Sequence, residues 1–246
     1  MRAPTDRTAS LWGVDASDES TRIKICCIAS IAEAELAIRH GVRVLGLVSA
    51  MPSGPGPIPE SAIAEIVRAV GQRAATVLLT SRQDAASIND QIARIQPAIV
   101  QFVDAIDAPT YEAVRRAHPR QRLMQVIHVR GSDSVHAAVG VAPFVDAILL
   151  DSGNPGAQVK ELGGTGRVHD WGVSRAVRDA VSVPVFLAGG LRAENVAQAI
   201  ARVQPFGVDV CSGVRIRGAL DADRLHSFVA AVRTALAAHT VDATRK

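Results

Sequence analysis

Aromatic side chains, cysteines and long apolar runs are all scarce in this chain of 246 residues. Phe, Trp and Tyr make up only 3% of it, so it lacks the aromatic platforms on which single-stranded nucleic acids stack. Its basic residues are scattered and its formal net charge is only +3, which argues against a nucleic-acid tract. No apolar run is long enough to span a membrane. We therefore expect neither a nucleic acid nor a membrane as a partner.

Signals for secretion and for metal binding are also missing. The first 20 residues are polar and contain no apolar core of a signal peptide. Three cysteines, two of them adjacent, cannot form a disulfide framework, which favours a cytoplasmic protein. The histidines and cysteines show no His-x-x-x-His or Cys-x-x-Cys spacing, so we expect no metal site. The glycine-lysine motif of nucleoside-triphosphate loops is absent as well.

What the chain does contain is a regular alternation of apolar runs and amphipathic segments. Hydrophobic residues make up 48% and charged residues 21% of it, which is typical of a globular core. The expected strands are Ile23–Ile28, Val42–Val48, Ala74–Leu79, Ala98–Phe102, Leu123–Val129, Phe144–Leu150, Val183–Leu187 and Val208–Val210. The expected helices are Ser30–Arg39, Pro59–Val70, Asp84–Ile95, Pro109–His118, Ser132–Val139, Asp170–Val181, Arg192–Val203 and Ala222–Ala238.

This alternation predicts the α/β class and, within it, a (β/α)8 TIM barrel. Eight strand–helix units match the size of such a barrel, and continuous apolar strands fit a parallel sheet that is buried on both faces. We expect one barrel domain over residues 21–240, preceded by an irregular extension over residues 1–20. A doubly wound open sheet is the alternative, but it usually carries a glycine motif after its first strand. Here that position holds Cys26-Cys27.

Three glycine-rich loops follow the sixth, seventh and eighth expected strands. They contain Gly164 and Gly166, then Gly190, and finally Ser212 and Gly213. Glycine lets backbone N–H groups approach an anion closely, and β/α barrels commonly hold phosphate in the loops after strands seven and eight. The pattern therefore predicts a phosphorylated small-molecule substrate bound by these five residues. Ordinary tight turns are the alternative explanation for each loop.

Two side chains at strand ends suit acid–base chemistry. Cys26 lies toward the end of the first expected strand, and a thiolate is a competent base if its pKa is lowered. Asp151 directly follows the apolar run of the sixth, and its carboxyl group can act as a general acid. The two can face each other across a barrel, as a ring-opening proton-transfer isomerisation requires. The alternatives are a small buried apolar residue for Cys26 and a loop cap for Asp151. Because strand side chains alternate, we expect Cys27 to point away from the pocket.

Four further residues are expected around the same pocket. Lys24 lies two positions before Cys26, deeper in the barrel, while Gln101, His128 and Arg130 lie at or near strand ends. A core histidine with its polar atoms satisfied is nearly as good an explanation for His128. The Pro- and Gly-rich stretch over residues 52–57 makes a stiff turn that fits a lid, an anion-binding nest or simply a rigid loop.

Several motifs together make the chain resemble the phosphoribosylanthranilate isomerase family over about residues 23–233. The motifs are Lys24-Ile25-Cys26-Cys27, Leu149-Leu150-Asp151, Gly163-Gly164-Thr165-Gly166, Leu187-Ala188-Gly189-Gly190-Leu191 and Asp209-Val210-Cys211-Ser212-Gly213-Val214. The resemblance implies a monomeric or homodimeric barrel that performs a cofactor-independent Amadori rearrangement of a phosphoribosyl amine in tryptophan biosynthesis. It also implies that Cys26 is the general base at C2 and Asp151 the general acid at the ring oxygen. Gly190, Ser212 and Gly213 match the family's phosphate-binding backbone.

The chain departs from the family pattern on the side of the aryl group. The usual Ser-Pro-Arg, whose Arg helps to hold the anthranilate carboxylate, reads Ser53-Gly54-Pro55. The usual Gln-Leu-His-Gly begins at Gln101 but has Val103 in place of the His, and the usual Gly after the catalytic cysteine is Cys27. We therefore expect either a replacement cation, with Arg130 and Arg215 as candidates, or a substrate that lacks the carboxylate.

Two other functions fit the same barrel less well. A phosphosugar aldolase or synthase needs a Schiff-base lysine inside the barrel, and Lys24, Lys160 and Lys246 are poorly placed for that role. A non-catalytic phosphosugar-binding barrel needs only the glycine loops, and the presence of both Cys26 and Asp151 argues against it. Fold alone does not separate these functions.

Overall fold

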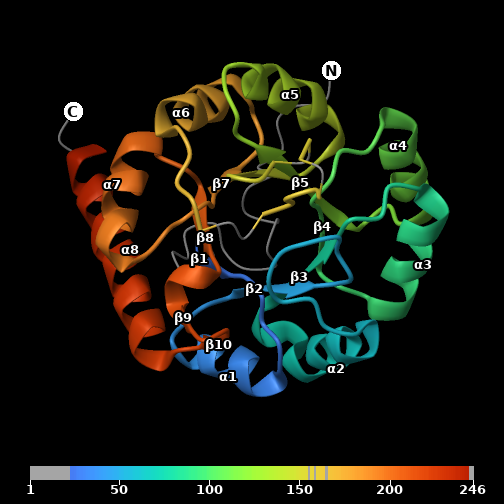
Figure 1. Ribbon diagram of the computed structural model, residues 1–246, viewed down its shortest axis with the longest axis horizontal. Helices are drawn as coiled ribbons and strands as arrows, with labels where there is room; N and C mark the ends of the chain where they lie inside the picture. The colour runs from blue at the N-terminus through green and yellow to red at the C-terminus, as the bar shows by residue number, and fades with distance from the viewer. Residues whose placement is uncertain (1–22, 155, 158, 164–165, 244–246) are drawn as a thin grey trace.

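Eight parallel strands close into a barrel, and the helices surround it (Figure 1). The computed structural model describes residues 23–154, 156–157, 159–163 and 166–243. The barrel strands are β1 (Ile23–Ile25), β2 (Val44–Val48), β3 (Ala75–Thr80), β4 (Ile99–Phe102), β5 (Arg122–His128), β6 (Ala147–Asp151), β7 (Val185–Leu187) and β8 (Gly207–Val210). Neighbouring strands pair in chain order, and β1 pairs with β8. The predicted (β/α)8 barrel is confirmed, and the open-sheet alternative is wrong. The predicted extension over residues 1–20 lies outside the described residues.

Each barrel strand is followed by a helix of the outer layer. The α-helices are α1 (Ile31–Arg39), α2 (Glu60–Val70), α3 (Ala85–Ile95), α4 (Ala108–Ala117), α5 (Asp133–Val141), α6 (Trp171–Ala180), α7 (Ala193–Val203) and α8 (Ala222–Ala243). Side-chain caps fix where several of them begin: Ser30 accepts from the N–H of Glu33, Asp84 from that of Ser87, and Asp170 from that of Gly172. In the described part of the chain, none of the helices is both long and apolar enough to cross a membrane.

The alternation of strand side chains divides the core into two layers. One cluster, which includes Ile148 and Leu150 of β6, packs between the strands and the helices. The other cluster fills the barrel interior and includes Ala147 and Leu149 of the same strand. Because side chains two apart share a face, the next residue of the inner set is Asp151. The strand period therefore directs this carboxyl group into the mouth of the barrel.

The structure corrects several expected element boundaries and adds a hairpin. The strand predicted over Ile23–Ile28 ends at Ile25, because Cys27 has a φ of 63° and leaves the extended conformation. Phe144, predicted to begin a strand, closes a 3-10 turn, η3 (Ala142–Phe144), which Pro143 favours through its fixed φ. A hairpin of β9 (Arg215–Ile216) and β10 (Ala219–Leu220) follows a second turn, η4 (Ser212–Val214). The hairpin had no counterpart among the predicted elements.

Candidate active site

A pocket opens where the barrel strands end, at the face on which β/α barrels carry their active sites. Cys26 lines it after β1, Asp151 at the end of β6 and Asp209 in β8. Cys26 is held in place by a hydrogen bond of 2.8 Å from its N–H to the carbonyl of Val210. A thiol and a carboxyl group from opposite parts of the strand order therefore share one pocket wall.

The local backbone fixes the carboxyl group of Asp151. Its Oδ1 accepts a hydrogen bond of 2.7 Å from the N–H of Ser152. Its Oδ2 lies so close to Gly163 that a Cβ added there would stand 2.5 Å from it. Gly163 also has a φ of 123°, which favours glycine. This position therefore requires glycine, and the following loop packs directly on the carboxyl group.

A buried ion pair lies next to the thiol. Lys24 and Asp209 are register partners across the seam between β1 and β8, and Lys24 Nζ lies 2.9 Å from Asp209 Oδ1. Burial alone lowers the pKa of an ammonium group, but the attraction of Asp209, assisted by Cys26 and Cys27, raises the pKa of Lys24 above its ordinary value. Burial also raises the pKa of Asp209, and Lys24 opposes that rise. The proton stays on Lys24, which places a positive charge beneath Cys26.

The same surroundings act on the Cys26 thiol. The hydrogen bond from Cys27 is the largest influence on the pKa of Cys26, followed by burial, which opposes it, and by the attraction of Lys24. The net result is a pKa below the ordinary value. A thiol with a lowered pKa is ionised in a larger fraction of molecules and can act as a base.

The glycine loops after β6, β7 and β8 meet at one side of the pocket. Gly166, Gly190 and Ser212 line it. A Cβ on Gly190 would stand 2.8 Å from the carbonyl oxygen of Gly166, and one on Gly213 would stand 2.1 Å from that of Leu191. Side chains at these two glycines would push the loops apart. Gly213 itself is not among the lining residues, but the absence of a side chain there lets η4 pack against Leu191. Gly164 lies outside the described residues.

The other four predicted pocket residues lie at different places relative to the pocket. Gln101 lines the pocket, and its Oε1 has no hydrogen-bond partner among the described residues. Lys24 is fully buried beneath the pocket. His128 turns toward β4, where its Nε2 lies 2.9 Å from the carbonyl oxygen of Val103, and it borders a neighbouring hollow together with Arg130. His128 and Arg130 are thus not among the lining residues of the central pocket, because the ring of His128, at the end of β5, lies against the carbonyl oxygen of Val103 and Arg130 lies beyond it.

Arg215, a candidate for the missing cation, has a different position from the one we expected. Its guanidinium is buried and lies 2.9 Å from Glu33 Oε1. It also donates hydrogen bonds to the carbonyl oxygens of Cys26 and Cys27, at 3.2 and 2.5 Å. These partners occupy the guanidinium, so Arg215 holds the backbone after β1 rather than facing the substrate.

The pocket also contains residues that the sequence did not single out. Cys27, expected to point away, lines the pocket beside Cys26, and Cys211 lines it as well. Met51 and Leu162 add apolar surface. The sequence pattern carries no signal for Met51 and Leu162, because both lie in loops, where no strand or helix period fixes the direction of a side chain. Among the described side chains, no group of three His, Cys, Asp or Glu residues is arranged to hold a metal ion.

The loop over residues 52–57 covers one edge of the pocket. Ser53 and Gly54 line it, and the Ser53 hydroxyl donates to the carbonyl oxygen of Lys160. The ammonium group of Lys160 in turn pairs with Asp104. Loops after β2, β4 and β6 are thus joined at the pocket mouth.

Comparison with known proteins agrees with this geometry. Residues 23–231 match the family model described as N-(5'-phosphoribosyl)anthranilate (PRA) isomerase. The N-(5'-phosphoribosyl)anthranilate isomerase 1 of Methanosarcina mazei is 33% identical over 228 residues, which cover 87% of this chain and 96% of that protein.

Solved structures give the same result. The phosphoribosyl anthranilate isomerase of Thermotoga maritima superposes with a TM-score of 0.72 at 27% identity, covering 87% of this chain and 99% of that one. A phosphoribosyl anthranilate isomerase in complex with reduced 1-(o-carboxyphenylamino)-1-deoxyribulose 5-phosphate gives 0.70 at 26% identity, with the same coverage. The chain therefore belongs to the N-(5'-phosphoribosyl)anthranilate isomerase family.

Proposed function

We propose that this protein is a cofactor-independent isomerase that converts N-(5'-phosphoribosyl)anthranilate, an aminoaldose, into the corresponding 1-deoxyribulose phosphate, an aminoketose. This is an Amadori rearrangement of tryptophan biosynthesis, and the cytoplasm is the compartment that fits its free thiols. The observation that carries the proposal is that Cys26, Asp151 and the glycine loops all line the same pocket. Family membership supports it.

The reaction needs one acid and one base. Asp151 donates a proton to the furanose ring oxygen, the C1–O bond breaks, and the substrate nitrogen supplies the electron pair that forms the C=N bond. The Cys26 thiolate then removes the proton from C2, and the resulting enolamine tautomerises to the ketone. Only protons move, and the product has the composition of the substrate. The substrate nitrogen serves as the electron sink, so no oxidant or reductant is consumed.

The rest of the pocket binds and orients the sugar. In our proposal the backbone of Gly166 and Gly190, with Ser212, holds the phosphate, and Gly213 supports the turn η4 that carries Ser212. Gly164, also expected to take part, lies outside the described residues. Lys24 acts from below as the charge that favours the Cys26 thiolate. Gln101 lines the pocket and has an amide oxygen without a partner among the described residues, so in our proposal it accepts a hydrogen bond from a sugar hydroxyl.

The decisive experiment measures turnover of freshly generated phosphoribosylanthranilate by the loss of its fluorescence. Cys26→Ala and Asp151→Asn should each reduce kcat by about 10²–10⁴-fold, because a general acid or base contributes that much. Asp90→Asn is the matched control, because this substitution removes the same charge from an exposed carboxylate of α3. Parental kcat in either active-site variant would remove that residue from the mechanism.

A second candidate is the same rearrangement of a phosphoribosyl amine whose aryl group lacks the carboxylate. Among the described residues of the pocket wall, Asp151 and Asp209 are present but no Lys or Arg is, and an unpaired buried carboxylate is costly. The test compares phosphoribosylanthranilate with the analogue that lacks the carboxylate. A charged hydrogen bond contributes about 1.5–3 kcal/mol, so a dedicated carboxylate site should favour the first substrate by about ten- to a hundred-fold.

Equal kcat/KM on the two substrates supports the second candidate, and a preference of several orders of magnitude for phosphoribosylanthranilate excludes it. If neither substrate turns over while phosphate still binds at the glycine loops, the enzymatic proposal is wrong and a phosphosugar-binding barrel takes its place.

A further inference from the structure

The hairpin of β9 and β10 takes no part in the proposed reaction, yet it begins directly beside the pocket. Ser212 lines the pocket from η4, and Arg215, the first residue of the hairpin, follows that turn. The hairpin lies next to α1 (Figure 1). It therefore connects the loop after the last barrel strand with the turn and the helix that follow the first strand.

The Arg215 guanidinium is buried between these segments, and its terminal nitrogens have acceptors on each side. Nη1 and Nη2 lie 2.9 and 3.1 Å from the two carboxylate oxygens of Glu33, which makes a bidentate pair. Nη1 also donates to the carbonyl oxygen of Gly218 at 2.9 Å. Nη2 donates to the carbonyl oxygens of Cys26 and Cys27 at 3.2 and 2.5 Å. One planar group thus binds the hairpin, the helix and the turn that carries Cys26.

Glu33 is fixed in its place by further bonds. Its carboxylate accepts a hydrogen bond of 3.0 Å from the N–H of Ala29 and one of 2.9 Å from the N–H of Leu220 in β10. Burial alone raises the pKa of Glu33, but the hydrogen bonds from Arg215 and from the two N–H groups outweigh it and hold this pKa below the ordinary value. The carboxylate is therefore ionised at neutral pH, and its pair with Arg215 is intact there.

The turn after β1 needs such support because its backbone is strained. Cys27 has a φ of 63°, in the left-handed region that residues other than glycine rarely adopt. The direction of the Cys26 side chain follows from the two peptide groups that flank its Cα. The N–H of one donates to the carbonyl oxygen of Val210 at 2.8 Å, and the carbonyl oxygen of the other accepts from Arg215. The guanidinium therefore fixes where the Cys26 thiol points.

Resting on the proposed function, we propose that Arg215, paired with Glu33, is a positioning residue for the base: it ties the turn that carries the Cys26 thiol to the loop that holds the substrate phosphate. A substrate bound by its phosphate presents C2 at a fixed distance from η4. The guanidinium fixes the turn relative to η4 and so places the thiol at that atom. Arg215 is not among the residues that line the pocket, and the steps of the reaction are unchanged.

The two ends of this link differ in how much they depend on Arg215. On the phosphate side, η4 has contacts of its own. A Cβ on Gly213 would stand 2.1 Å from the carbonyl oxygen of Leu191, and the N–H of Val214 donates to the carbonyl oxygen of Cys211 at 3.4 Å. On the base side, the strained turn relaxes when its partner is removed. Loss of Arg215 should therefore move the thiol and leave the phosphate site in place.

The test separates binding from chemistry. Arg215→Met should lower kcat on phosphoribosylanthranilate by about 10²-fold, because a misplacement of about 1 Å at the reacting groups costs that much. The dissociation constant of inorganic phosphate, measured by isothermal titration calorimetry, should keep its parental value. Both are measured at a temperature at which circular dichroism shows the variant to be folded. A loss of phosphate affinity equal to the loss of kcat overturns the proposal, because Arg215 would then support the pocket as a whole.

Arg224→Met is the matched control. Arg224 also donates to a backbone carbonyl of the hairpin, that of Arg215, at 3.0 Å. Among the described residues, its guanidinium donates to no carbonyl oxygen of the turn after β1. This variant should therefore keep the parental kcat. An equal loss of kcat in Arg215→Met and Arg224→Met overturns the proposal, because any loosening of the hairpin would then have the same effect.

Glu33→Gln keeps the size of the side chain and serves as a second variant if Arg215→Met does not fold. Its uncharged amide weakens the hold on the guanidinium, so kcat should fall here too while the affinity for phosphate stays at its parental value. Because the two residues act as a unit, the double variant should lose no more kcat than Arg215→Met alone. Parental kcat in both single variants overturns the proposal, and so do losses that multiply in the double variant.

A crystal structure of Arg215→Met gives a readout that needs no substrate. Cys26 Sγ should shift by about 1 Å, while Ser212 should stay in place. A shifted thiol, together with a parental enzyme that does not turn over, rejects the substrate assignment and retains the positioning role. Normal turnover of the parent, with an unshifted thiol and parental kcat in the variants, rejects the positioning role and retains the enzyme.

Discussion

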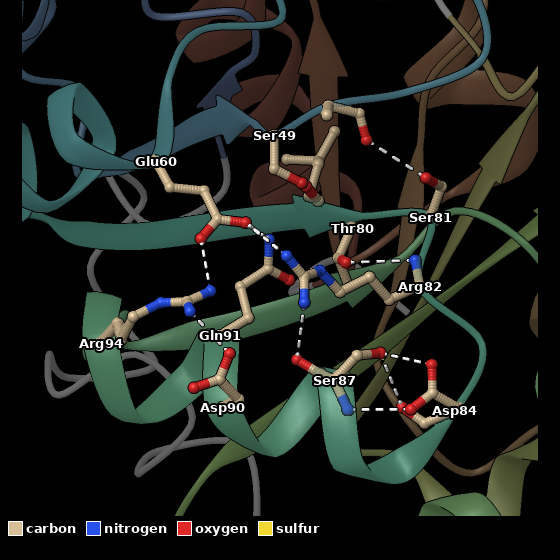
Figure 2. Close-up of polar contacts among 12 residues, drawn as sticks. Ser49, Glu60, Thr80, Ser81, Arg82, Asp84, Ser87, Asp90, Gln91 and Arg94 are labelled. Carbon is tan, nitrogen blue, oxygen red and sulfur yellow. Dashed lines mark hydrogen bonds and ion pairs between the residues drawn. The ribbon is translucent and has the colours of Figure 1, made fainter.

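Two clusters of opposite charges, one inside the barrel and one between two helices, show how burial changes the consequence of the same contact. Lys24 and Asp209 are 2.9 Å apart, and their side chains are 0% and 8% exposed. Glu60 of α2 binds Arg82 and Arg94 at 2.8 and 2.7 Å (Figure 2). These three side chains are 28–51% exposed. The distances in the two clusters are similar, but the exposure of their side chains to solvent differs.

Water decides what each cluster does. Around Glu60, water screens the charges and each pair contributes little to stability. Inside the barrel, Lys24 and Asp209 give up hydration that their attraction only partly replaces, so removing either partner leaves a charge without compensation. A buried ion pair of this kind therefore adds little to the net stability of the fold. Its position beside Cys26 instead supplies a fixed positive charge where the proposed mechanism needs a thiolate.

The largest effect is expected from the buried pair. Asp209→Asn leaves the Lys24 ammonium without its counter-charge and should lower the free energy of unfolding by about 3–5 kcal/mol, measured by urea denaturation. Asp90→Asn, which makes the same change at an exposed carboxylate of α3, should cost less than about 1 kcal/mol. Equal losses in the two variants would mean that the interior pair is as well solvated as the surface pair, and the comparison would fail.

An intermediate effect is expected from Arg215, whose side chain is 7% exposed. Arg215→Met removes the donor to the carbonyl oxygens of Cys26 and Cys27 and leaves Glu33 without its guanidinium. Buried groups left unsatisfied cost about 1–3 kcal/mol, which denaturation also measures. Arg116→Met on α4 is the control, because its side chain is 72% exposed. A loss of unfolding free energy no greater than that of the control would show that the turn after β1 keeps its conformation without Arg215.

The smallest effect is expected from the surface cluster. Glu60→Gln removes the charge that Arg82 and Arg94 share and should cost at most about 1 kcal/mol. Because exposed charges are screened by salt, the difference from the parent should shrink between 0.05 and 1 M NaCl. A large and salt-independent loss would place this cluster with the buried pair and would remove the distinction drawn between them.

Much of the fold and part of the site follow from local patterns in the sequence. Apolar runs and capped amphipathic segments predict the barrel, and the strand period directs Asp151 and Gln101 inward. The same reasoning fails to predict the direction of the Cys27 side chain, because the φ of Cys27 is fixed by Arg215 and by neighbouring strands that are distant in sequence. Arg215, one of two candidates for the replacement cation, has a position that was equally hidden in the sequence. A lone arginine gives no sign of the carbonyl oxygens that it will meet.

The aryl side of the pocket is the least predictable part. His128 was expected to line the pocket, but its Nε2 lies 2.9 Å from the carbonyl oxygen of Val103, just after β4. Met51 and Leu162 come from loops whose path depends on tertiary contacts, such as the link from Ser53 to Lys160. Loop conformation is set by partners and not by period, so the sequence predicted that Cys26 and Asp151 lie in the pocket better than it predicted the loops around them.

The pairing of Lys24 with Asp209 also bears on the order in which the molecule assembles. The two residues are 185 positions apart and belong to the first and last strands, so they meet only when the ring of strands closes. Contacts between distant parts of a chain form slowly, because the entropy of the long loop is lost before the contact contributes. The ion pair beneath Cys26 therefore depends on closure of the barrel. A chain in which β8 has not paired with β1 lacks it, so the surroundings of the Cys26 thiol are complete only in the closed ring of strands.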